Sequence, residues 1–216
     1  MSSVSRVSEL TVGSLLIYPK GSSPESSAAR AFIRYQIKQG RRGSIEYSAR
    51  RLREILPGSV LEGFFAGDET LVPVPGHAPR FQGGLWVAER ICRALVAEGI
   101  GREVATLLDR VEVVPRSSIL TTATGRPGPE QHCRTLSVGE LLGKPARILL
   151  VDDVVTRGST LIGCTMRMRE AFPSIDIRAF ALARVEGTDL ESRSTMLSPK
   201  VEAIHYDETT AFLERS

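Results

Sequence analysis

The chain has 216 residues, of which 42% are hydrophobic and 25% are charged, and its formal net charge is +3. This composition excludes a disordered chain and fits one domain, or one domain with an appended lobe. The small positive charge does not by itself indicate nucleic acid, but it suits a small anionic ligand.

Cysteine spacing and the hydrophobic pattern bound the cellular setting. Cys92, Cys133 and Cys164 lie far apart and form no C-x-x-C pair, so we expect neither disulfides nor a structural zinc site. The first residues lack the basic patch and apolar core of a signal peptide. No apolar run has the length needed to cross a bilayer. We therefore expect a cytoplasmic protein with no membrane partner.

Hydrophobic periodicity and turn residues predict helices and strands that alternate along the chain. In chain order they are a helix at 28–39, a helix at 46–56, a strand at 70–74, a helix at 84–98, a strand at 111–114, a strand at 148–151, a helix at 159–171 and a strand at 175–183. This alternation predicts an α/β fold with a largely parallel sheet.

Residues 115–135 have no clear period and are rich in Ser, Thr, Gly, Pro and Arg. A segment of this length without structure inside a compact domain is typical of a functional lid or a disordered loop. It carries Arg116, Arg126, His132 and Arg134, so a lid made from it would be cationic.

The most informative stretch is 148–161, I-L-L-V-D-D-V-V-T-R-G-S-T-L. Gly158 allows the main chain to wrap closely around a ligand. Ser159 and Thr160 stand at the expected start of a helix, where unpaired N–H groups and the helix dipole favour negative charge. With the Thr156 hydroxyl added, these residues predict a phosphate-binding turn.

Two carboxylates, Asp152 and Asp153, precede this turn. They would repel a phosphate, so they are better suited to accept hydrogen bonds from ligand hydroxyls or to help place a hydrated Mg²⁺. A ligand with a phosphate and a vicinal diol is a ribose 5-phosphate. The alternative is an ordinary strand, polar turn and helix cap. The G-x-x-x-x-G-K-[ST] loop of P-loop kinases and ATPases is absent, which disfavours an enzyme of that type. The apolar strand before the aspartates is also typical of response regulators, but that fold begins with this strand. Here only 65 residues follow Val151, so we reject that fold.

The stretch resembles the signature of type I phosphoribosyltransferases, an apolar strand, two acidic residues and T-x-G-x-T. Within that family the segment L-V-P-V-P-G-H-A-P-R at 71–80 resembles the ComF-like branch related to amidophosphoribosyltransferases. The resemblance is specific over 147–184. The chain departs from the family in reading T-R-G-S-T for T-T-G-A-T, in having F-Q-G-G-L-W at 81–86 for R-G-F-N, and in lacking a cysteine-rich zinc module.

This resemblance implies a type I phosphoribosyltransferase-like, Rossmann-like parallel sheet flanked by helices, with a small hood. Residues 1–67 would form the helical hood and residues 68–216 the α/β core. The implied activity is Mg²⁺-dependent transfer of the 5-phosphoribosyl group of phosphoribosyl pyrophosphate (PRPP) to a nucleobase or amine, with release of pyrophosphate. The Mg²⁺ would be held mainly by PRPP, with no direct protein ligand assigned.

The resemblance also implies roles for individual residues. Asp152 and Asp153 would hold the ribose hydroxyls. The 5-phosphate would lie among Thr156, Arg157, Gly158, Ser159 and Thr160. The pyrophosphate loop would contain Pro75, Gly76, His77 and Arg80. Segment 115–135 would be the catalytic loop, with Arg116 and Arg134 as the first candidate cations, followed by Arg126 and His132.

The acceptor is not identified by the sequence. Tyr18, Lys20, Lys38 and Tyr47 are candidate contacts in the hood, and the tail after Arg184 is a second candidate contributor. A different interpretation is a phosphoribosyltransferase-like regulator that senses PRPP or a nucleoside monophosphate without turnover. Direct nucleic-acid binding by the N-terminal arginines is the least favoured hypothesis, and a homodimer stays open.

Overall fold

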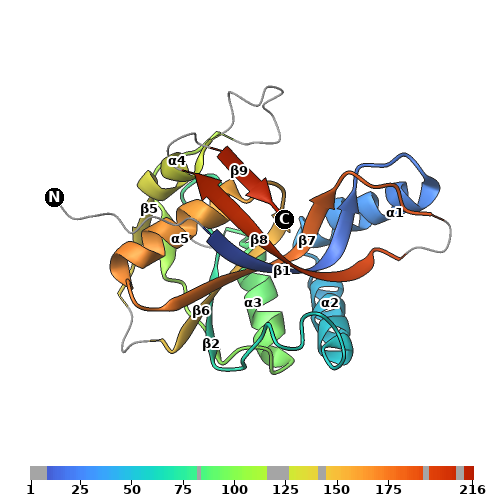
Figure 1. The fold of residues 1–216 in the computed structure, drawn as a ribbon, viewed down its shortest axis with the longest axis horizontal. Helices are drawn as coiled ribbons and strands as arrows, with labels where there is room; N and C mark the ends of the chain where they lie inside the picture. Colours follow the sequence, from blue (N-terminus) through green and yellow to red (C-terminus); the bar gives the residue numbers. More distant parts are fainter. Residues whose placement is uncertain (1–8, 82–83, 116–126, 141–144, 192–194, 208–211) are drawn as a thin grey trace.

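A seven-stranded sheet forms the centre of the protein (Figure 1). The structure is a computed structural model and describes residues 9–81, 84–115, 127–140, 145–191, 195–207 and 212–216. In sheet order the strands are β3 (Glu103–Val104), β2 (Glu69–Pro73), β6 (Arg147–Val155), β7 (Asp176–Glu186), β1 (Glu9–Pro19), β8 (Leu197–Asp207) and β9 (Phe212–Arg215). The five strands from β3 to β1 are parallel to one another. Strand β8 is antiparallel to β1, and β9 is antiparallel to β8. The predicted α/β fold with a largely parallel sheet is confirmed.

Helices cover both faces of this sheet. They are α1 (Pro24–Phe32), the π-helical turn η1 (Ile33–Ile37), α2 (Arg42–Ile55), α3 (Val87–Ala97), α4 (Pro129–Arg134) and α5 (Ser159–Ala171). One core contains side chains of α5 and α4, and a second contains side chains of η1, α2 and α3. Figure 1 shows α4 beside α5 and α2 beside α3. A small antiparallel pair, β4 (Leu108–Arg110) and β5 (Leu136–Val138), completes the structure.

Strand β6 contributes to both cores because successive side chains point to opposite faces. Ile148 and Leu150 belong to the core under α5, whereas Leu149 and Val151 belong to the core under α2 and α3. A strand buried on both faces reads as a continuous apolar run, which is why the sequence around Leu149 identified it.

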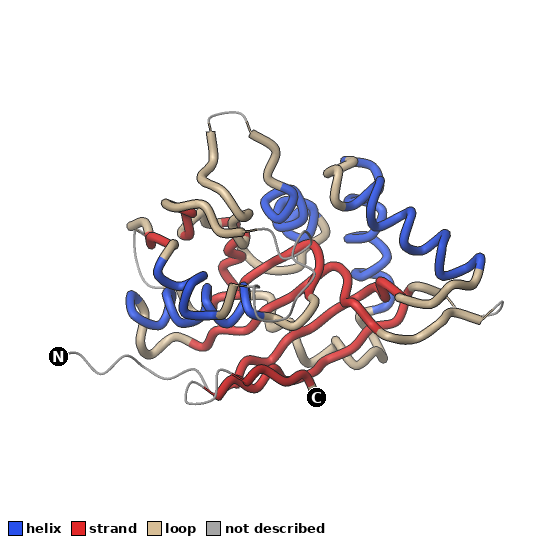
Figure 2. Tube along the Cα trace, turned by 90° about the horizontal axis from the view of Figure 1, so that it is seen from above, coloured by secondary structure: helices blue, strands red, loops and turns tan. Residues whose placement is uncertain are grey.

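The neighbouring strands β2 and β6 lead to helices on opposite faces of the sheet. Helix α3 follows β2 into one core, and α5 follows β6 into the other. Figure 2 shows helices on both sides of the strands. Where helices diverge in this way, the turns after the two strands separate and leave a crevice at the carboxyl end of a parallel sheet, the usual place for a ligand. The fold thus directs attention to the turns that follow β2 and β6.

Several predicted elements match the structure closely, namely β2, α3, β6, α5 and β7. The predicted strand at 111–114 is wrong, because β4 ends at Arg110 and the following residues are irregular. The predicted helix at 28–39 is divided between α1 and η1. Segment 115–135 is partly helical, since it contains α4, while residues 116–126 lie outside the described residues.

The sequence interpretation missed strands β1, β8 and β9. Strand β1 lies inside the segment 1–67 that was expected to be a helical hood, and it pairs with β7 and β8 within the main sheet. The remaining part of that segment is helical. Whether α1, η1 and α2 act as a hood over a ligand stays a prediction.

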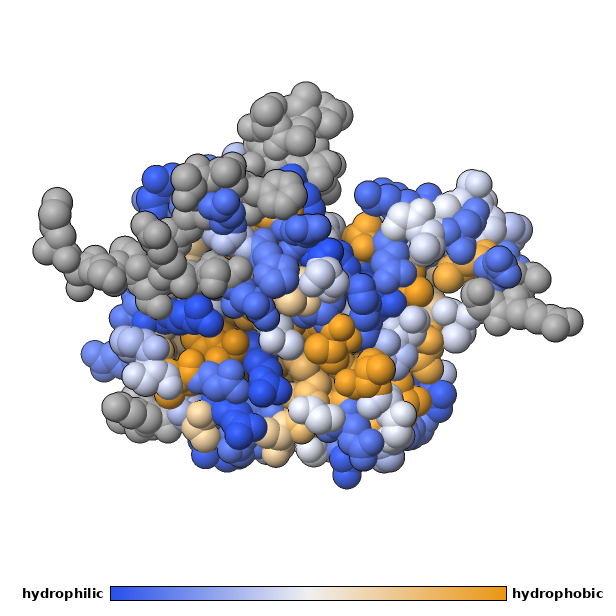
Figure 3. All heavy atoms as spheres, viewed as in Figure 1, coloured by the Kyte–Doolittle hydropathy of each residue, from blue (hydrophilic) through white to orange (hydrophobic). Residues whose placement is uncertain are grey.

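The described residues contain no helix that is both long enough and apolar enough to cross a membrane. On the face drawn in Figure 3, hydrophilic side chains cover most of the surface and hydrophobic groups gather in its lower half.

We expect Phe180→Ala to lower the free energy of unfolding by about 3–5 kcal/mol, as is typical for truncating a buried aromatic residue. Phe180 is fully buried at the centre of β7, and its ring packs edge-on against Phe65 at 5.4 Å between centroids. Urea unfolding checks this value. Val60→Ala is the control, because Val60 is 64% exposed and its truncation should change stability by less than about 0.5 kcal/mol.

Candidate functional site

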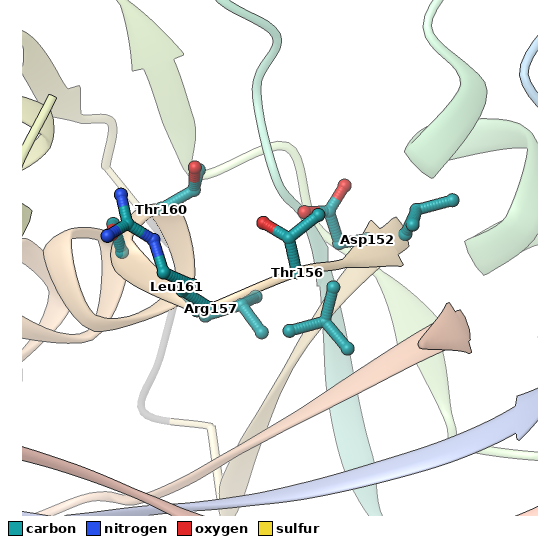
Figure 4. A pocket seen from close by; sticks show the side chains of 9 residues that line it. Asp152, Thr156, Arg157, Thr160 and Leu161 are labelled. Atoms are coloured by element: carbon teal, nitrogen blue, oxygen red, sulfur yellow. The ribbon is translucent and has the colours of Figure 1, made fainter. Parts of the chain in front are cut away.

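The turn between β6 and α5 encloses a small cavity (Figure 4). Its volume is about 40 Å³. The residues that line it are Asp152, Val154, Val155, Thr156, Arg157, Gly158, Ser159, Thr160 and Leu161. The first hydrogen bond of α5 runs from the Ile162 amide to the Gly158 carbonyl, at 2.9 Å, so the amides of 159–161 precede the hydrogen-bond ladder of the helix. The structure therefore brings the five residues predicted for a phosphate, and Asp152, around one cavity.

Gly158 is required in this turn for two physical reasons. Its φ of 95° lies in the left-handed region that other residues rarely adopt. A Cβ atom at this position would also lie 2.3 Å from Cδ1 of Ile204, on strand β8. On the same side of the turn, Arg215 of β9 donates a hydrogen bond to the Thr156 carbonyl. The C-terminal strands β8 and β9 thus support the phosphate-binding turn from behind.

The two aspartates face different surroundings because they are neighbours on one strand. Asp152 follows the register of Ile148 and Leu150 and lines the cavity. Asp153 follows the register of Leu149 and does not line the cavity. Its Oδ2 lies 4.0 Å from Nζ of Lys38, which directly follows η1. The acidic pair therefore spans the end of β6, with one carboxylate toward α5 and one toward the N-terminal helices.

The environment of Asp152 disfavours its charged form. Burial raises the pKa of this carboxyl well above its usual range, and the adjacent Asp153 raises it further. The backbone amide of Asp153 donates a hydrogen bond to Asp152 Oδ1 at 2.8 Å, which favours the charged form but does not outweigh the other two effects. An acidic side chain kept at an energetic cost beside a cavity is typical of a functional site.

The turn after β2 is fixed by contacts with β4. The Gly76 carbonyl, one residue after Pro75, accepts a hydrogen bond from Arg110 Nε at 3.0 Å. The His77 carbonyl accepts one from the Val114 amide at 2.7 Å. Arg80 forms an ion pair with Asp109 at 3.0 Å, and its guanidinium also lies 4.0 Å from the centre of the Trp86 ring. The predicted pyrophosphate turn thus has a defined position, but the charge of Arg80 is already shared with a carboxylate.

The four candidate cations of the lid differ in position and burial. Arg116 and Arg126 lie outside the described residues. Arg134 is exposed at the end of α4 and does not line the cavity. His132 is buried, and burial, together with the charge of Arg110, lowers its pKa to about 4. These surroundings favour a neutral His132 ring at pH 7 over a cationic one, and a role of His132 in a lid stays a prediction. Burial likewise raises the pKa of the Cys133 thiol to about 11, which makes it a poor nucleophile.

Among the four candidate acceptor contacts, Lys38 is the one that the structure places beside the acidic pair. Its position follows from the π-helical turn, in which the Lys38 amide bonds to the Ile33 carbonyl at 2.9 Å. Tyr18 is half-buried near the end of β1, and Lys20 and Tyr47 are exposed. Short π-helical turns such as η1 are frequent at functional sites.

Three arginines of the N-terminal helices form ion pairs with neighbouring carboxylates. Arg42 pairs with Glu46 at 2.7 Å, Arg50 with Glu98 at 3.8 Å, and Arg51 with Glu54. These contacts reduce the positive field that a nucleic-acid backbone would need.

Four residues important to the geometry were not identified from the sequence. They are Arg110, Gly163, Ile204 and Arg215. No local signal in the sequence singles out Arg110, because Asp109 and Glu112 carry charges in the same segment, L-L-D-R-V-E-V-V. The other three act through contacts with segments distant in the sequence.

Asp152→Asn should raise the free energy of unfolding at pH 8 by about 0.5–2 kcal/mol, the range of typical stabilising substitutions. The pKa of Asp152 is higher in the folded chain than in the unfolded chain, so its ionisation disfavours folding. The gain should be complete above the folded pKa and should vanish below the ordinary carboxyl pKa, where the wild-type side chain is protonated in both states. Urea unfolding from pH 8 downward measures it. Equal stability of variant and wild type at pH 8 would contradict the prediction.

We expect Gly158→Ala to destabilise the protein by more than about 2 kcal/mol, since left-handed strain of about 1–2 kcal/mol adds to the collision with Ile204. Gly67→Ala is a matched control, because Gly67 has a φ of 85° with nothing within 4 Å of a Cβ. Urea unfolding of both variants separates strain from collision. In a double-mutant cycle, Gly158→Ala should cost less stability in an Ile204→Ala background than in the wild type, and an equal cost in both backgrounds would mean that Ile204 does not collide with a side chain at position 158.

The site's geometry can be set beside known proteins. No family model matches the chain, and no curated protein matches it. Among solved structures, the hypoxanthine-guanine phosphoribosyltransferase of L. donovani is 13% identical over 70% of this chain and 75% of that chain, with a TM-score of 0.33. A hypoxanthine phosphoribosyltransferase from Staphylococcus aureus is 16% identical over 70% and 71%, with a TM-score of 0.32. Likeness at this level does not decide a function.

Proposed function

We propose that the protein binds PRPP and transfers its 5-phosphoribosyl group to an unidentified nucleobase or amine, with release of pyrophosphate. The observation that carries this proposal is the cavity at the turn between β6 and α5, where Asp152 and the turn 156–160 lie together. A site for a phosphate next to a carboxylate that accepts hydrogen bonds from hydroxyls suits a phosphorylated ribose. The type I phosphoribosyltransferase resemblance of the motif supports the same ligand.

In this proposal the start of α5 binds the 5-phosphate. Amides of 159–161 and hydroxyls of Thr156 and Thr160 donate hydrogen bonds, and Arg157 contributes a positive charge from the same turn. Asp152 accepts from one ribose hydroxyl on the α5 side of β6. Asp153 accepts from the other on the opposite side, and exchanges its contact with Lys38 for the ligand.

The turn at 75–80 follows β2, the strand paired with β6, which supports a place for it next to the phosphate-binding turn. Pyrophosphate leaving from C1 of the ribose would bind there, and loss of this group leaves positive charge on the sugar. Mg²⁺ bound to PRPP would neutralise negative charge on the leaving group. Within the described residues no cluster of three or more His, Cys, Asp or Glu side chains could hold a metal by itself. In this proposal the Mg²⁺ is held mainly by PRPP, with no direct protein ligand assigned.

The acceptor would approach from the side of η1 and α2. Lys38 lies there, next to Asp153, the carboxylate proposed to bind a ribose hydroxyl. The π-helical turn η1, which directly precedes Lys38, sets its position. Residues 1–67, apart from strand β1, would act as the hood. Arg116 and Arg126, with Arg134 at the end of α4, would close over PRPP and exclude water, which would otherwise hydrolyse it.

A second candidate function is a regulator that binds PRPP or a nucleoside monophosphate without turnover. Two observations favour it. Arg80 is already paired with Asp109, and His132 is neutral, so the described part of the site offers fewer cations for the leaving group than the motif suggested. Binding followed by turnover distinguishes the two functions.

The test is calorimetric titration of PRPP with Mg²⁺ into wild type, Asp153→Asn and Asp152→Asn/Asp153→Asn. We expect micromolar binding to wild type and a loss of at least about 10-fold in each variant, because a hydroxyl loses a charged acceptor. Pyrophosphate release is then measured over a panel of nucleobases and amines. The matched control is Asp176→Asn. Asp176 is an exposed carboxylate at the start of β7, next to the start of β6 and so at the end of the sheet away from Asp152 and Asp153.

Release that depends on one acceptor would establish the transferase and identify its substrate. Binding without release from any acceptor would favour the regulator. Absence of PRPP binding by the wild-type protein would reject the transferase, and absence of binding of nucleoside monophosphates as well would reject the regulator.

A further inference from the structure

A buried arginine lies beneath the two turns of the site. Arg110, the last residue of β4, is 3% exposed. Its guanidinium donates to the Gly76 carbonyl at 3.0 Å, to the His132 carbonyl at 3.1 Å and to the Thr135 hydroxyl. No carboxylate of the described chain lies within ion-pair distance of it. A buried cation held by neutral acceptors alone is costly, and it calls for a role beyond packing.

His132 connects this arginine to the phosphate-binding turn. Nδ1 of its ring lies 3.4 Å from Arg110 Nη2, and Nε2 lies 3.4 Å from the Thr160 hydroxyl oxygen. A guanidinium has only donors, so Nδ1 must accept and the ring hydrogen must be on Nε2. The lowered pKa of His132 agrees with this neutral form. Nε2–H then donates to the Thr160 oxygen.

Thr160 thereby receives a fixed orientation. Its oxygen accepts from His132, and its single hydrogen is left to donate elsewhere. Thr160 also lines the cavity at the start of α5. A phosphate oxygen in that cavity is the acceptor that suits the remaining hydrogen.

The packing of α4 on α5 makes this contact geometrically firm. A Cβ atom on Gly163 would lie 2.5 Å from His132 Cβ and 2.6 Å from the Pro129 carbonyl oxygen. Only glycine allows α4 to approach so closely, one turn after Thr160. His132 is therefore pressed against the first turn of α5.

We propose that Arg110 and His132 are positioning residues of the anion site, in which Arg110 holds the turn at Gly76 and fixes the tautomer of His132, and His132 directs the Thr160 hydroxyl toward the ligand phosphate. This inference rests on the proposed function, since it assigns the ligand contact of Thr160. It makes the turns after β2 and β6 share one buried anchor.

The proposal is tested by calorimetric affinities for ribose 5-phosphate and PRPP in His132→Phe, His132→Gln, Arg110→Gln and Arg184→Gln. His132→Phe should weaken both ligands about 10-fold, the size expected for one hydrogen bond to a charged group. His132→Gln should stay within about 3-fold of wild type, because its amide supplies a donor near the place of Nε2–H. Arg110→Gln should resemble His132→Phe.

Arg184→Gln is the matched control for stability. Arg184 is equally buried, at 3% exposure, but its side chain is paired with Glu186 and contacts Ser14 and Ser198, none of which lines the cavity. Its substitution should lower the melting temperature without changing either affinity. Equal losses of affinity in Arg110→Gln and Arg184→Gln would reduce the role of Arg110 to general stability and overturn the proposal.

A readout independent of ligand is the ¹⁵N spectrum of the His132 ring in the free protein. We expect the Nε2-protonated neutral form throughout pH 5.5–8 (roughly the range over which an ordinary histidine titrates). An Nδ1-protonated ring, or a ring that titrates in this range, would overturn the proposal. Wild-type binding with unchanged affinity in His132→Phe would also overturn it while leaving the proposed function intact. Failure of wild type to bind either ligand would instead reject the proposed function.

Discussion

The burial of β6 on both faces is the constraint on which the rest of the structure depends. Because apolar side chains of this strand enter two separate cores, helices must cover both sides of the sheet, and α5 leaves β6 on the face opposite to α3. The polar residues Asp152 and Asp153, which follow the apolar run, therefore lie at the carboxyl end of the strand. Hydrophobic burial thus places the acidic pair and the phosphate-binding turn without any contribution from a ligand.

The candidate site carries energetic costs that packing elsewhere offsets. Asp152 has a raised pKa, and Gly158 has a left-handed backbone. Arg110 is buried, and no carboxylate of the described residues forms an ion pair with it. Such costs concentrate where a ligand is to be bound, because the ligand supplies the missing partners. An anion at the start of α5 would meet hydroxyls and amides already in place.

Strands β8 and β9 show how distant segments determine a local motif. Ile204 fills the space that any side chain at position 158 would need, and Arg215 bonds to the carbonyl of Thr156. The turn therefore keeps its shape only when the C-terminal strands are in place. The same holds for α4, which reaches Thr160 because position 163 has no side chain.

The sequence by itself determined the parallel α/β fold, the strand β6, the glycine turn before α5 and the acidic pair that precedes it, because their signals are local: an apolar run, a turn glycine and a helix start. It did not reveal β1 or the C-terminal strands, whose partners are far away in the chain. Only the tertiary structure set Lys38 beside Asp153 and buried the His132 ring against Arg110. Those outcomes depend on burial and on contacts between distant segments, which a residue pattern does not contain.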